Sequence, residues 1–432
     1  MSLEARIHAL QERARRGMEL GLEPTRRALA DLGDPHLGLQ CVHVAGSNGK
    51  GSVSAMVESI LRDAGLSTGL YTSPHLCRFS ERVRLDGEPI DERAFERSLA
   101  AVIEGCHPEL TFFESLTVAA FHAFHEARVD VAVLEVGLGG RLDATNVVPA
   151  PLCTAVTSIA LEHTQWLGST LDRIAREKAG IFKPRAPVVL GPLPGEAAAA
   201  VEDVAAAIGA GPTWRVARGA SRADDEVLVL ERDGRVEIRS GTDRAPVCVE
   251  LGLRGSHQAE NAAVAAGIAW RVAETWPAVA DHVAPGLTRA RWPGRFERID
   301  RGGVQVILDC AHNPHGADAL AAALAAEGVD PARTTLVFGA LADKSWPEML
   351  ARLSPLAQRR IYTAPKGRPA ADLAALAGAA PGEGMADPAR AVDLAIAGAR
   401  AGDTVVVTGS IYLVGEVRGA LLGIDCDPFI AL

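Results

Sequence analysis

The sequence is poor in aromatic residues, in paired cysteines and in positive charge. Aromatic side chains make up 4% of the 432 residues, and the 7 cysteines are scattered singly, with no C-x-x-C pair. This spacing argues against cysteine metal clusters and dithiol redox motifs, and an odd, dispersed set suits a reducing compartment. The formal net charge of −10 argues against a nucleic-acid surface, which usually carries a basic excess.

Long apolar runs are also missing. No window approaches the roughly 18 apolar residues of a membrane span. The N-terminal segment MSLEARIHALQERARR is charged and has a helical pattern, without the apolar region of a signal peptide. We therefore expect a soluble, cytoplasmic protein that binds neither membrane nor nucleic acid.

The composition that is present is that of a globular α/β protein. Apolar residues make up 48% and charged residues 23%, and 432 residues exceed what a single hydrophobic core usually supports. We predict two domains, residues 1–293 and 294–432, with the boundary in the proline-containing region that ends at Pro293.

Short apolar runs alternate with helical patterns along the chain, which predicts βαβ units and mainly parallel sheets. In the first domain the predicted strands are 41–46, 68–72, 131–136, 154–159 and 187–191, and the predicted helices are about 50–64, 91–104, 114–127, 170–180 and 195–208. Residues 213–253 break this alternation with a hairpin whose turn is at Asp233-Gly234, and a helix of about 256–275 follows. The second series of strands is 304–310, 334–340, 360–364 and 404–409.

The stretch VHVAGSNGKGSVSAM joins a predicted strand to a predicted helix through glycines. It departs from the usual G-x-x-x-x-G-K-[ST] spelling, because Val44 stands six residues before Lys50 and Gly51 separates Lys50 from Ser52. Converging backbone amides and a helix N-terminus favour phosphate, with Lys50 as the point charge and the Ser52 hydroxyl directed to Mg²⁺. The alternative is a plain glycine-rich turn, but the strand and helix on either side favour phosphate binding.

Two polar residues follow neighbouring predicted strands. Glu135 ends the buried run VAVLEV, where a carboxylate is costly unless it meets a cation or a donor. We interpret it as a Mg²⁺ ligand, with a capping or ion-paired carboxylate as the alternative. His163, in SIALEHTQWLG, would alone be as readily structural, but beside Glu135 and the glycine loop it becomes a candidate metal ligand. Lys178 has the pattern of an ordinary solvated helix lysine.

Nine motifs occur in order from about Leu20 to about Ser410: VAGSNGKGS, YTSPHLCRFSERVR, TFFESLT, LEVGLGGRLDATN, LEHTQWLG, REKAGIFK, PGRFE, DCAHNP and TGS. The series resembles the folylpolyglutamate synthase/dihydrofolate synthase family of the ATP-dependent Mur ligase superfamily. The resemblance implies an α/β fold, with an N-terminal P-loop-type ATPase domain on a mainly parallel sheet and a smaller Rossmann-like C-terminal domain. It also implies an acid–amino-acid ligase using ATP and Mg²⁺.

In that reaction ATP phosphorylates the carboxylate of dihydropteroate or of a folate, and L-glutamate then attacks the acyl phosphate. By resemblance the ATP phosphates meet Gly46, Ser47, Asn48, Gly49, Lys50, Gly51 and Ser52. ATP is also reached by Asn261, at the adenine, and by Arg295 and Asp309. The metal ligands would be Ser52, Thr72, Glu135 and His163, and the catalytic residues Lys50, His312 and Lys178, the last carbamylated.

The remaining residues implied by the resemblance belong to substrate binding. They are Leu20, Gly21, Arg82, Thr111, Phe112, Phe113, Glu114, Leu142, Asp143, Ala144 and Ser410. Plainer roles exist: Asn261 as a surface amide, Arg295 as a hinge ion pair and Asp309 as a strand-end cap. Phe112 and Phe113 could begin a core helix, and Arg82 could be a solvated loop charge. Three positions depart from the family pattern, namely Ser47 for Thr, Glu162 for Asp, and Cys310 for Gly or Val.

Alternative functions remain open. They are folylpolyglutamate synthesis alone, another amino-acid ligase of the same superfamily, or a regulatory P-loop ATPase. TFFE and LGGRLDATN favour the folate branch, while Asp309 and His312, aimed by resemblance at ATP, argue against a regulatory ATPase. We expect a monomer whose partners are its small-molecule substrates.

Overall fold

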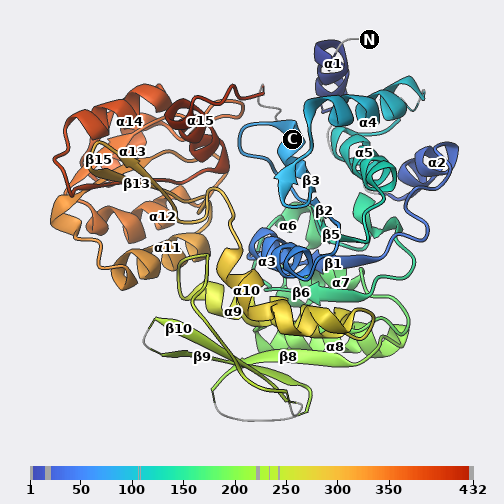
Figure 1. Ribbon diagram of the computed structural model, residues 1–432. Coiled ribbons are helices and arrows are strands. Elements are labelled where there is room, and N and C mark those ends of the chain that lie inside the picture. Colours follow the sequence, from blue (N-terminus) through green and yellow to red (C-terminus); the bar gives the residue numbers. More distant parts are fainter. Residues whose placement is uncertain are drawn as a thin grey trace.

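The computed structural model describes residues 3–14, 21–105, 107, 109–219, 224–232, 234–241 and 244–427. Leu20, expected in a substrate site, and Asp233, expected in a turn, lie outside these residues. The described strands form two sheets, of eleven and six strands. Figure 1 shows the smaller sheet, with its own helices, as a separate lobe beside the larger one. The predicted α/β fold is confirmed.

The larger sheet has the strand order β11-β10-β9-β8-β7-β6-β1-β5-β2-β3-β4. From β9 to β2 neighbouring strands run parallel, and both edges are antiparallel. The strands are β1 (Cys41–Ala45), β2 (Thr68–Tyr71), β3 (Val83–Leu85), β4 (Glu88–Pro89), β5 (Val131–Glu135), β6 (Cys153–Val156), β7 (Val188–Leu190), β8 (Thr213–Arg218), β9 (Glu226–Arg232), β10 (Arg235–Ser240) and β11 (Val247–Val249).

The order of strands around β1 positions the site. Every residue of β1 and β5 is buried, as expected for strands covered on both faces. The chain runs from β1 to β2 on one side, whereas β6 lies on the other side of β1. Ligands of open α/β sheets bind where the strand order reverses in this way, beyond the carboxyl ends of the strands. The loops after β1, β5 and β6 therefore open into one crevice.

Helices cover both faces of this sheet. Val42 and Val44 of β1 pack with α3, α9 and α10, whereas Cys41 and Ala45 belong to the clusters of the other face, with α4 and α5 or with α7 and α8. The helices are α1 (Leu3–Ala14), α2 (Glu23–Asp31), α3 (Lys50–Asp63), α4 (Glu92–Glu104), α5 (Phe112–Ala127), α6 (Thr164–Leu167), α7 (Leu171–Ala179), α8 (Gly195–Ile208), α9 (His257–Val272) and α10 (Val283–Arg289).

The predicted hairpin is present as the antiparallel pair β9 and β10, with Arg232 opposite Arg235. The break in rhythm begins later than predicted, because β8 still pairs parallel with both β7 and β9. Strand β8 was missed because its sequence TWRVAR alternates polar and apolar residues, unlike the continuous apolar runs of the central strands.

The smaller sheet has the order β12-β13-β17-β14-β15-β16 and is parallel except for β12. Its strands are β12 (Glu297–Arg301), β13 (Val304–Leu308), β14 (Thr334–Phe338), β15 (Arg359–Tyr362), β16 (Glu383–Gly384) and β17 (Thr404–Thr408). Its helices are α11 (Pro314–Ala326), α12 (Trp346–Leu353), α13 (Leu373–Ala379), α14 (Pro388–Ala397) and α15 (Ile411–Leu422). The four strands predicted here are all present, and β12 and β16 are additional.

One loop of the first domain is buried in the second. Leu76 and Cys77, between β2 and β3, belong to the apolar cluster formed by β13, β17 and α15. Gly415 of α15 makes room for this loop, because a Cβ there would lie 2.2 Å from the carbonyl oxygen of Leu76. The two domains therefore share part of their core.

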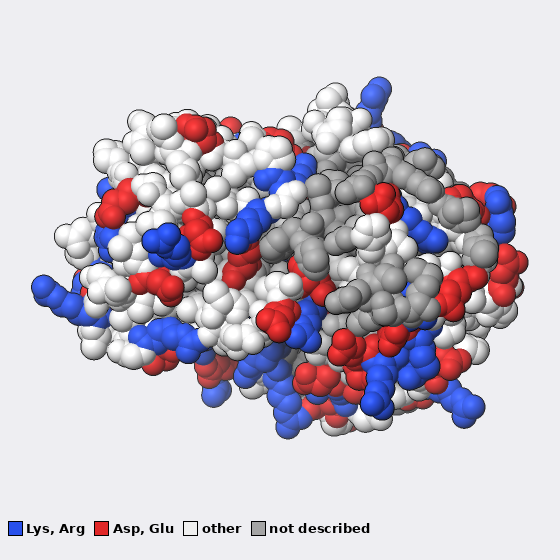
Figure 2. Space-filling model, turned by 90° about the horizontal axis from the view of Figure 1, so that it is seen from above, with Lys and Arg blue, Asp and Glu red and all other residues white. Residues whose placement is uncertain are grey.

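The described residues contain no helix long and apolar enough to cross a membrane. On the face shown in Figure 2, acidic and basic side chains are interspersed.

Candidate active site between the two domains

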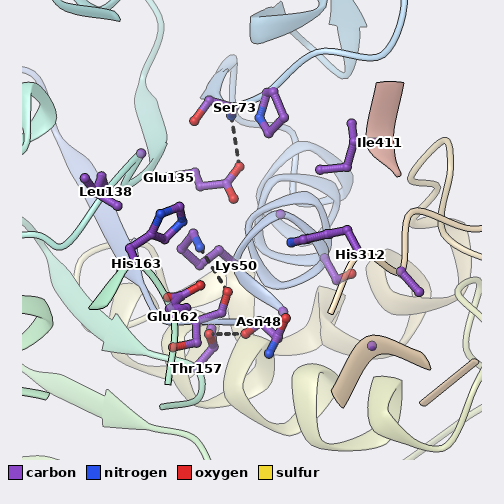
Figure 3. Close-up of a pocket in the computed structure, with 18 of the residues that line it drawn as sticks. Asn48, Lys50, Ser73, Glu135, Leu138, Thr157, Glu162, His163, His312 and Ile411 are labelled. Carbon is purple, nitrogen blue, oxygen red and sulfur yellow. Dashed lines mark hydrogen bonds between the residues drawn. The ribbon is translucent and has the colours of Figure 1, made fainter. Parts of the chain in front are cut away.

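The crevice beyond β1, β5 and β6 is a cavity of about 480 Å³ lined by both domains. The first domain contributes the glycine loop, Glu135 and His163, and the second contributes Asp309 and His312. Figure 3 shows Glu135, His163 and Lys50 gathered on one side of the cavity and His312 opposite them. Residues from several predicted motifs thus meet at one place.

The glycine loop needs its glycines. Gly46 and Gly49 have positive φ angles of 148° and 86°. A Cβ on Gly46 would lie 2.0 Å from the Thr157 hydroxyl oxygen, and one on Gly49 would lie 2.5 Å from the Asn261 amide oxygen. The loop therefore lies directly against the end of β6 and against α9, while the N-terminus of α3 faces the cavity, as a phosphate site requires.

Side chains after β6 hold the loop in place. The Asn48 amide donates to Ser158 Oγ at 2.9 Å, and its carbonyl accepts from Thr157 Oγ1 at 2.7 Å. Lys50 folds back over the loop, and its Nζ donates to the Gly46 carbonyl oxygen at 2.8 Å. The ammonium group thus stands at the cavity wall with a neutral backbone partner.

Glu135 ends β5 with its carboxylate buried. Its Oε2 accepts a hydrogen bond from the Ser73 amide at 3.2 Å, as Figure 3 shows. Burial raises the pKa of Glu135 to about 7, against the opposing charge of Lys50. Ser73 lines the main cavity, whereas Thr72 lines only a smaller pocket beside it. The metal role expected of Thr72 stays a prediction, because Glu135 borders both pockets, and Ser73 is a second hydroxyl residue beside this carboxylate.

His163 follows β6 in the left-handed region, with φ 45°. Its ring is exposed toward the cavity, yet partial burial in the cleft lowers its pKa below the usual value. The imidazole is therefore neutral near pH 7, which is the form that binds a metal ion.

Lys178 is buried behind this side of the cavity. Its Nζ lies 2.8 Å from Glu162 Oε1 and donates to the Gly46 carbonyl oxygen at 3.0 Å. Burial lowers the pKa of Lys178 to about 8, although Glu162 opposes the shift. Burial alone would raise the pKa of Glu162, but the charges of Lys178 and Lys50 hold it below its usual range. Glu162 lines the cavity, whereas Lys178 is not among the lining residues. Lys178 is therefore a buried lysine, and not the solvated one that its helical pattern indicates.

The described residues contain no group of three or more His, Cys, Asp or Glu side chains able to hold a metal ion. Glu135, His163, Ser52 and Ser73 therefore do not close a cage of protein ligands. Mg²⁺ normally keeps several waters and binds one or two carboxylates together with substrate phosphates. This set of side chains fits such an ion beside the glycine loop, and it does not fit a structural metal.

Helix α9 lines the side of the cavity next to the glycine loop. Asn261 Nδ2 donates to Gln258 Oε1 at 2.9 Å, and Gln258 Nε2 donates to Ser52 Oγ at 3.4 Å. Burial and the charge of Arg295 lower the pKa of His257 to about 4, which leaves its imidazole neutral. Asn261 is thus held in place and faces the cavity; it is not a free surface amide.

Asp309 and Arg295 lie at the junction of the domains. The Asp309 carboxylate accepts hydrogen bonds from the amides of Phe296 at 3.0 Å and Ala311 at 2.9 Å. Burial raises its pKa, and Arg295 opposes the rise. Asp309 therefore caps the end of its strand and also lines the cavity.

His312 has a defined hydrogen-bonding state. Its Nδ1 lies 2.9 Å from the Cys310 carbonyl oxygen. Because a carbonyl oxygen can only accept, Nδ1 carries the proton and donates this hydrogen bond. Burial lowers the pKa of His312 to about 4, so the ring is neutral and Nε2 is an acceptor. The imidazole lines the cavity as an uncharged acceptor from the second domain.

Arg82 is almost fully buried at the wall of the cavity. Its Nε donates to His75 Nδ1 at 2.9 Å, and its Cζ lies 5.1 Å from the centre of the Phe112 ring. Its Nη1 is buried with no hydrogen-bond partner among the described residues. Because Arg82 lines the cavity, it is a candidate for binding an anionic group there.

Thr111 and Glu114 form a capping box at the start of α5. Glu114 Oε2 accepts from the Thr111 amide at 2.7 Å, and Thr111 Oγ1 accepts from the Glu114 amide at 3.3 Å. These polar atoms thus cap the start of the helix, and both residues also line the cavity. Phe113 lies on Gly137, where a Cβ would come within 2.4 Å of the ring.

Asp143 organises the loop after β5. Its Oδ2 accepts from the amides of Gly137 at 3.0 Å and Leu138 at 2.9 Å. Leu142 and Ala144 line the cavity on either side of it. Of the other expected substrate residues, Ser410 lines the cavity and caps α15, whereas Gly21 is not among the lining residues.

Among the second-domain residues that line the cavity and were not predicted are two cations. Lys344 and Arg368 both line the cavity, and Arg368 lies 3.3 Å from the carboxylate of Asp343. A sequence signal existed for Lys344, since GALADKS follows a predicted strand at the edge where ligands bind. No comparable signal marks Arg368.

Comparisons with known proteins agree with this architecture. Residues 44–269 match the family model of the Mur ligase middle domain, and residues 294–411 match that of the Mur ligase, glutamate ligase domain. A probable bifunctional folylpolyglutamate synthase/dihydropteroate synthase of Halobacterium salinarum is 39% identical over 97% of this chain, but the match covers 51% of that relative. The chain thus spans about half the length of this relative.

Other relatives match over nearly their full length. The dihydrofolate synthase/folylpolyglutamate synthase of Escherichia coli is 36% identical over 93% of this chain and 91% of its own. The solved structure of E. coli FolC in complex with DHPP and ADP superposes with a TM-score of 0.82, at 34% identity over 94% of each chain. The chain therefore belongs to the folylpolyglutamate synthase/dihydrofolate synthase family of Mur ligases.

Proposed function

We propose that the chain is an ATP-dependent ligase that joins L-glutamate to dihydropteroate, to the γ-carboxylate of a folate, or to both. The observation that carries the proposal is the single cavity in which the glycine loop and Glu135 face Asp309 and His312 of the second domain. A site for the ATP phosphates on one wall and a site for L-glutamate on the opposite wall suit a reaction that proceeds through an acyl phosphate. The names of the relatives and the DHPP and ADP bound by the E. coli protein point the same way.

The chemistry needs an activated carboxylate, because a carboxylate oxygen is otherwise a poor leaving group. The substrate carboxylate attacks the γ-phosphorus of ATP and ADP leaves. The amine of L-glutamate then attacks the acyl carbon, phosphate leaves, and a proton is lost from the nitrogen. The protein mainly positions the reactants and balances charge.

Different residues of the cavity would bind ATP, the pteroate or folate, and the metal ion. The amides at the start of α3 and the Lys50 ammonium would bind the ATP phosphates, and Asn261 would face the adenine. Arg82, with its unpartnered Nη1, would bind an anionic group of the pteroate or folate. Mg²⁺, held by Glu135, His163 and the Ser52 and Ser73 hydroxyls, would neutralise phosphate charge.

The second domain would receive the amino acid. Lys344 and Arg368 are cations suited to the carboxylates of L-glutamate, and the neutral Nε2 of His312 can accept a hydrogen bond from its amine. The attacking nitrogen must be deprotonated, so an uncharged acceptor suits this position better than an imidazolium. We further propose that Lys178 is carbamylated, since an amine with a pKa near 8 is partly neutral at physiological pH.

A product assay tests the proposal. ATP turnover should require both L-glutamate and a pteroate or folate acceptor, and parallel reactions with dihydropteroate and tetrahydrofolate identify the acceptor. Lys50→Ala should abolish turnover, because the phosphates lose their only loop cation. Steady phosphate release from ATP alone would instead support a regulatory ATPase. We expect the active species to be a cytoplasmic monomer of one catalytic site, which gel filtration of the active fraction checks.

A further inference from the structure

The segment after α15 returns from the second domain to the first. Figure 1 shows the red end of the chain reaching the light-blue segment that leads into β3. Hydrogen bonds between described residues join the two segments. The Asp427 amide donates to the Cys77 carbonyl oxygen at 2.7 Å, Arg78 Nε donates to the Asp425 carbonyl oxygen at 3.0 Å, and the Phe79 amide donates to Asp427 Oδ2 at 2.7 Å.

Only one of these contacts depends on a side chain of the tail. The Asp427 carboxylate accepts from the Phe79 amide, whereas Asp425 contributes its carbonyl oxygen. A hydrogen bond from an amide to a carboxylate is stronger than one between neutral groups. Asp427 therefore fixes the backbone of Phe79.

Phe79 packs against the two side chains that contact Arg82. Its buried ring packs edge-on against His75, with centres 4.8 Å apart, and against Phe112, with centres 5.7 Å apart. These are the two side chains that hold Arg82, His75 through Nε and Phe112 beneath the guanidinium. A shift of the Phe79 backbone would move both supports of Arg82.

The rest of this loop is already rigid. The Glu81 carboxylate accepts hydrogen bonds from the amides of Leu76, Cys77 and Arg78. A loop braced in this way moves as one body, so an anchor at Phe79 sets the position of its whole length. The same loop begins at Ser73, next to Glu135.

We propose that Asp427 is a positioning residue by which the second domain holds Arg82 in its binding geometry for the anionic acceptor substrate. The inference rests on the role proposed above for Arg82 in acceptor binding. It gives the second domain a part in acceptor recognition, although no tail residue up to Asp427, where the described part of the chain ends, lines the cavity. Asp427 acts through Phe79 and does not touch the substrate.

The test compares Asp427→Ala with Asp425→Ala, a matched loss of one carboxylate two residues away that keeps the carbonyl contact. Steady-state kinetics and equilibrium binding of dihydropteroate are measured for both variants, with KM for ATP and thermal unfolding alongside. Asp427→Ala should weaken dihydropteroate binding about 5–20-fold, as expected for loss of a charge-assisted hydrogen bond, with KM for ATP nearly unchanged. Asp425→Ala should match the parent enzyme, and Asp427→Asn should retain most binding, because its Oδ1 can still accept from the Phe79 amide.

Arg82→Ala separates this inference from the proposed function. If Arg82→Ala leaves dihydropteroate binding unchanged, the role of Arg82 is wrong and the inference falls with it. If Arg82→Ala weakens binding and Asp427→Ala does not, only the inference is wrong. Equal losses for ATP and dihydropteroate in Asp427→Ala would show a general structural role and also overturn it. Should Asp427→Ala fail to fold, Asp427→Ser, whose hydroxyl is too short to reach Phe79, takes its place in the same comparison.

Discussion

Lys178 and Glu162 form a largely buried ion pair directly behind the glycine loop, with 2.8 Å between Nζ and Oε1. The same Nζ also donates to the Gly46 carbonyl oxygen, so the pair braces the loop from below. Carbamylation of Lys178 would replace the cation by an anion beside Glu162. The two carboxylates would then repel each other unless a cation lay between them.

Lys178→Ala should therefore damage both stability and activity. Removing one partner of a buried pair typically costs about 3–5 kcal/mol, because the other charge is left uncompensated. Adding Glu162→Gln should recover most of that stability, measured by denaturant unfolding, without recovering turnover. A short carboxylic acid should partly restore turnover to Lys178→Ala if the carbamate is the active form. Absence of any rescue would count against carbamylation.

Ser73 and Thr72 offer a matched pair of hydroxyls. Ser73→Ala should raise the Mg²⁺ concentration needed for half-maximal turnover about 10-fold, since Ser73 lines the cavity beside Glu135. Thr72→Val, which keeps the shape of the side chain, should change that concentration little. The reverse ranking in a Mg²⁺ titration would support Thr72, and not Ser73, as the ligand.

Glu135 predicts a pH effect of defined sign. Its pKa in the fold is about 7, above the ordinary value of 4.5, so the native state without metal favours the protonated carboxyl. Stability of the metal-free protein should fall as the pH rises from about 5 through 7, by up to about 3 kcal/mol. Glu135→Gln should remove this dependence and unfold at a higher temperature than the parent at pH 8, while losing activity. Thermal unfolding curves of the parent protein and of Glu135→Gln, recorded at pH 5 and pH 8 in the presence of a metal chelator, test this prediction.

Lys344 predicts a selective effect on the amino acid. Lys344→Ala should raise KM for L-glutamate about 10–100-fold, as loss of a charged hydrogen-bond donor would, with KM for ATP changed far less. Lys366→Ala is the control, because Lys366 is exposed, pairs with Glu416 at 3.3 Å, and is not among the residues that line the cavity. Similar kinetics for the two variants would remove Lys344 from the site.

The fold and the centre of the site were accessible from sequence because their signals are local. A buried apolar run followed by GSNGKGS predicts β1, the turn and α3, and Glu135 is marked by its position at the end of a second such run. Strand periodicity does not fix which of two adjacent hydroxyls faces a cavity. The choice between Thr72 and Ser73 depends on how the chain bends after β2, which only the packed structure gives.

Long-range contacts explain the remaining differences. Thr111 and Glu114 look like substrate ligands in the motif, yet their polar atoms pair with each other across one helical turn. Lys344 reaches the cavity only because the second sheet packs against the first domain. The insertion of Leu76 into the second core is likewise set by the facing Gly415, 339 residues further along the chain.

Leu76 and Cys77 also limit how such enzymes can be recombined. Their side chains are encoded with the first domain but complete the apolar core of the second. A chimaera that exchanges the C-terminal domain at the hinge would place this loop against the α15 of another protein. If that helix lacked a glycine at the position of Gly415, the loop would clash with it, and if its core had a different shape, Leu76 would leave a cavity. The functional unit of exchange is therefore the second domain together with residues 73–82 of the first.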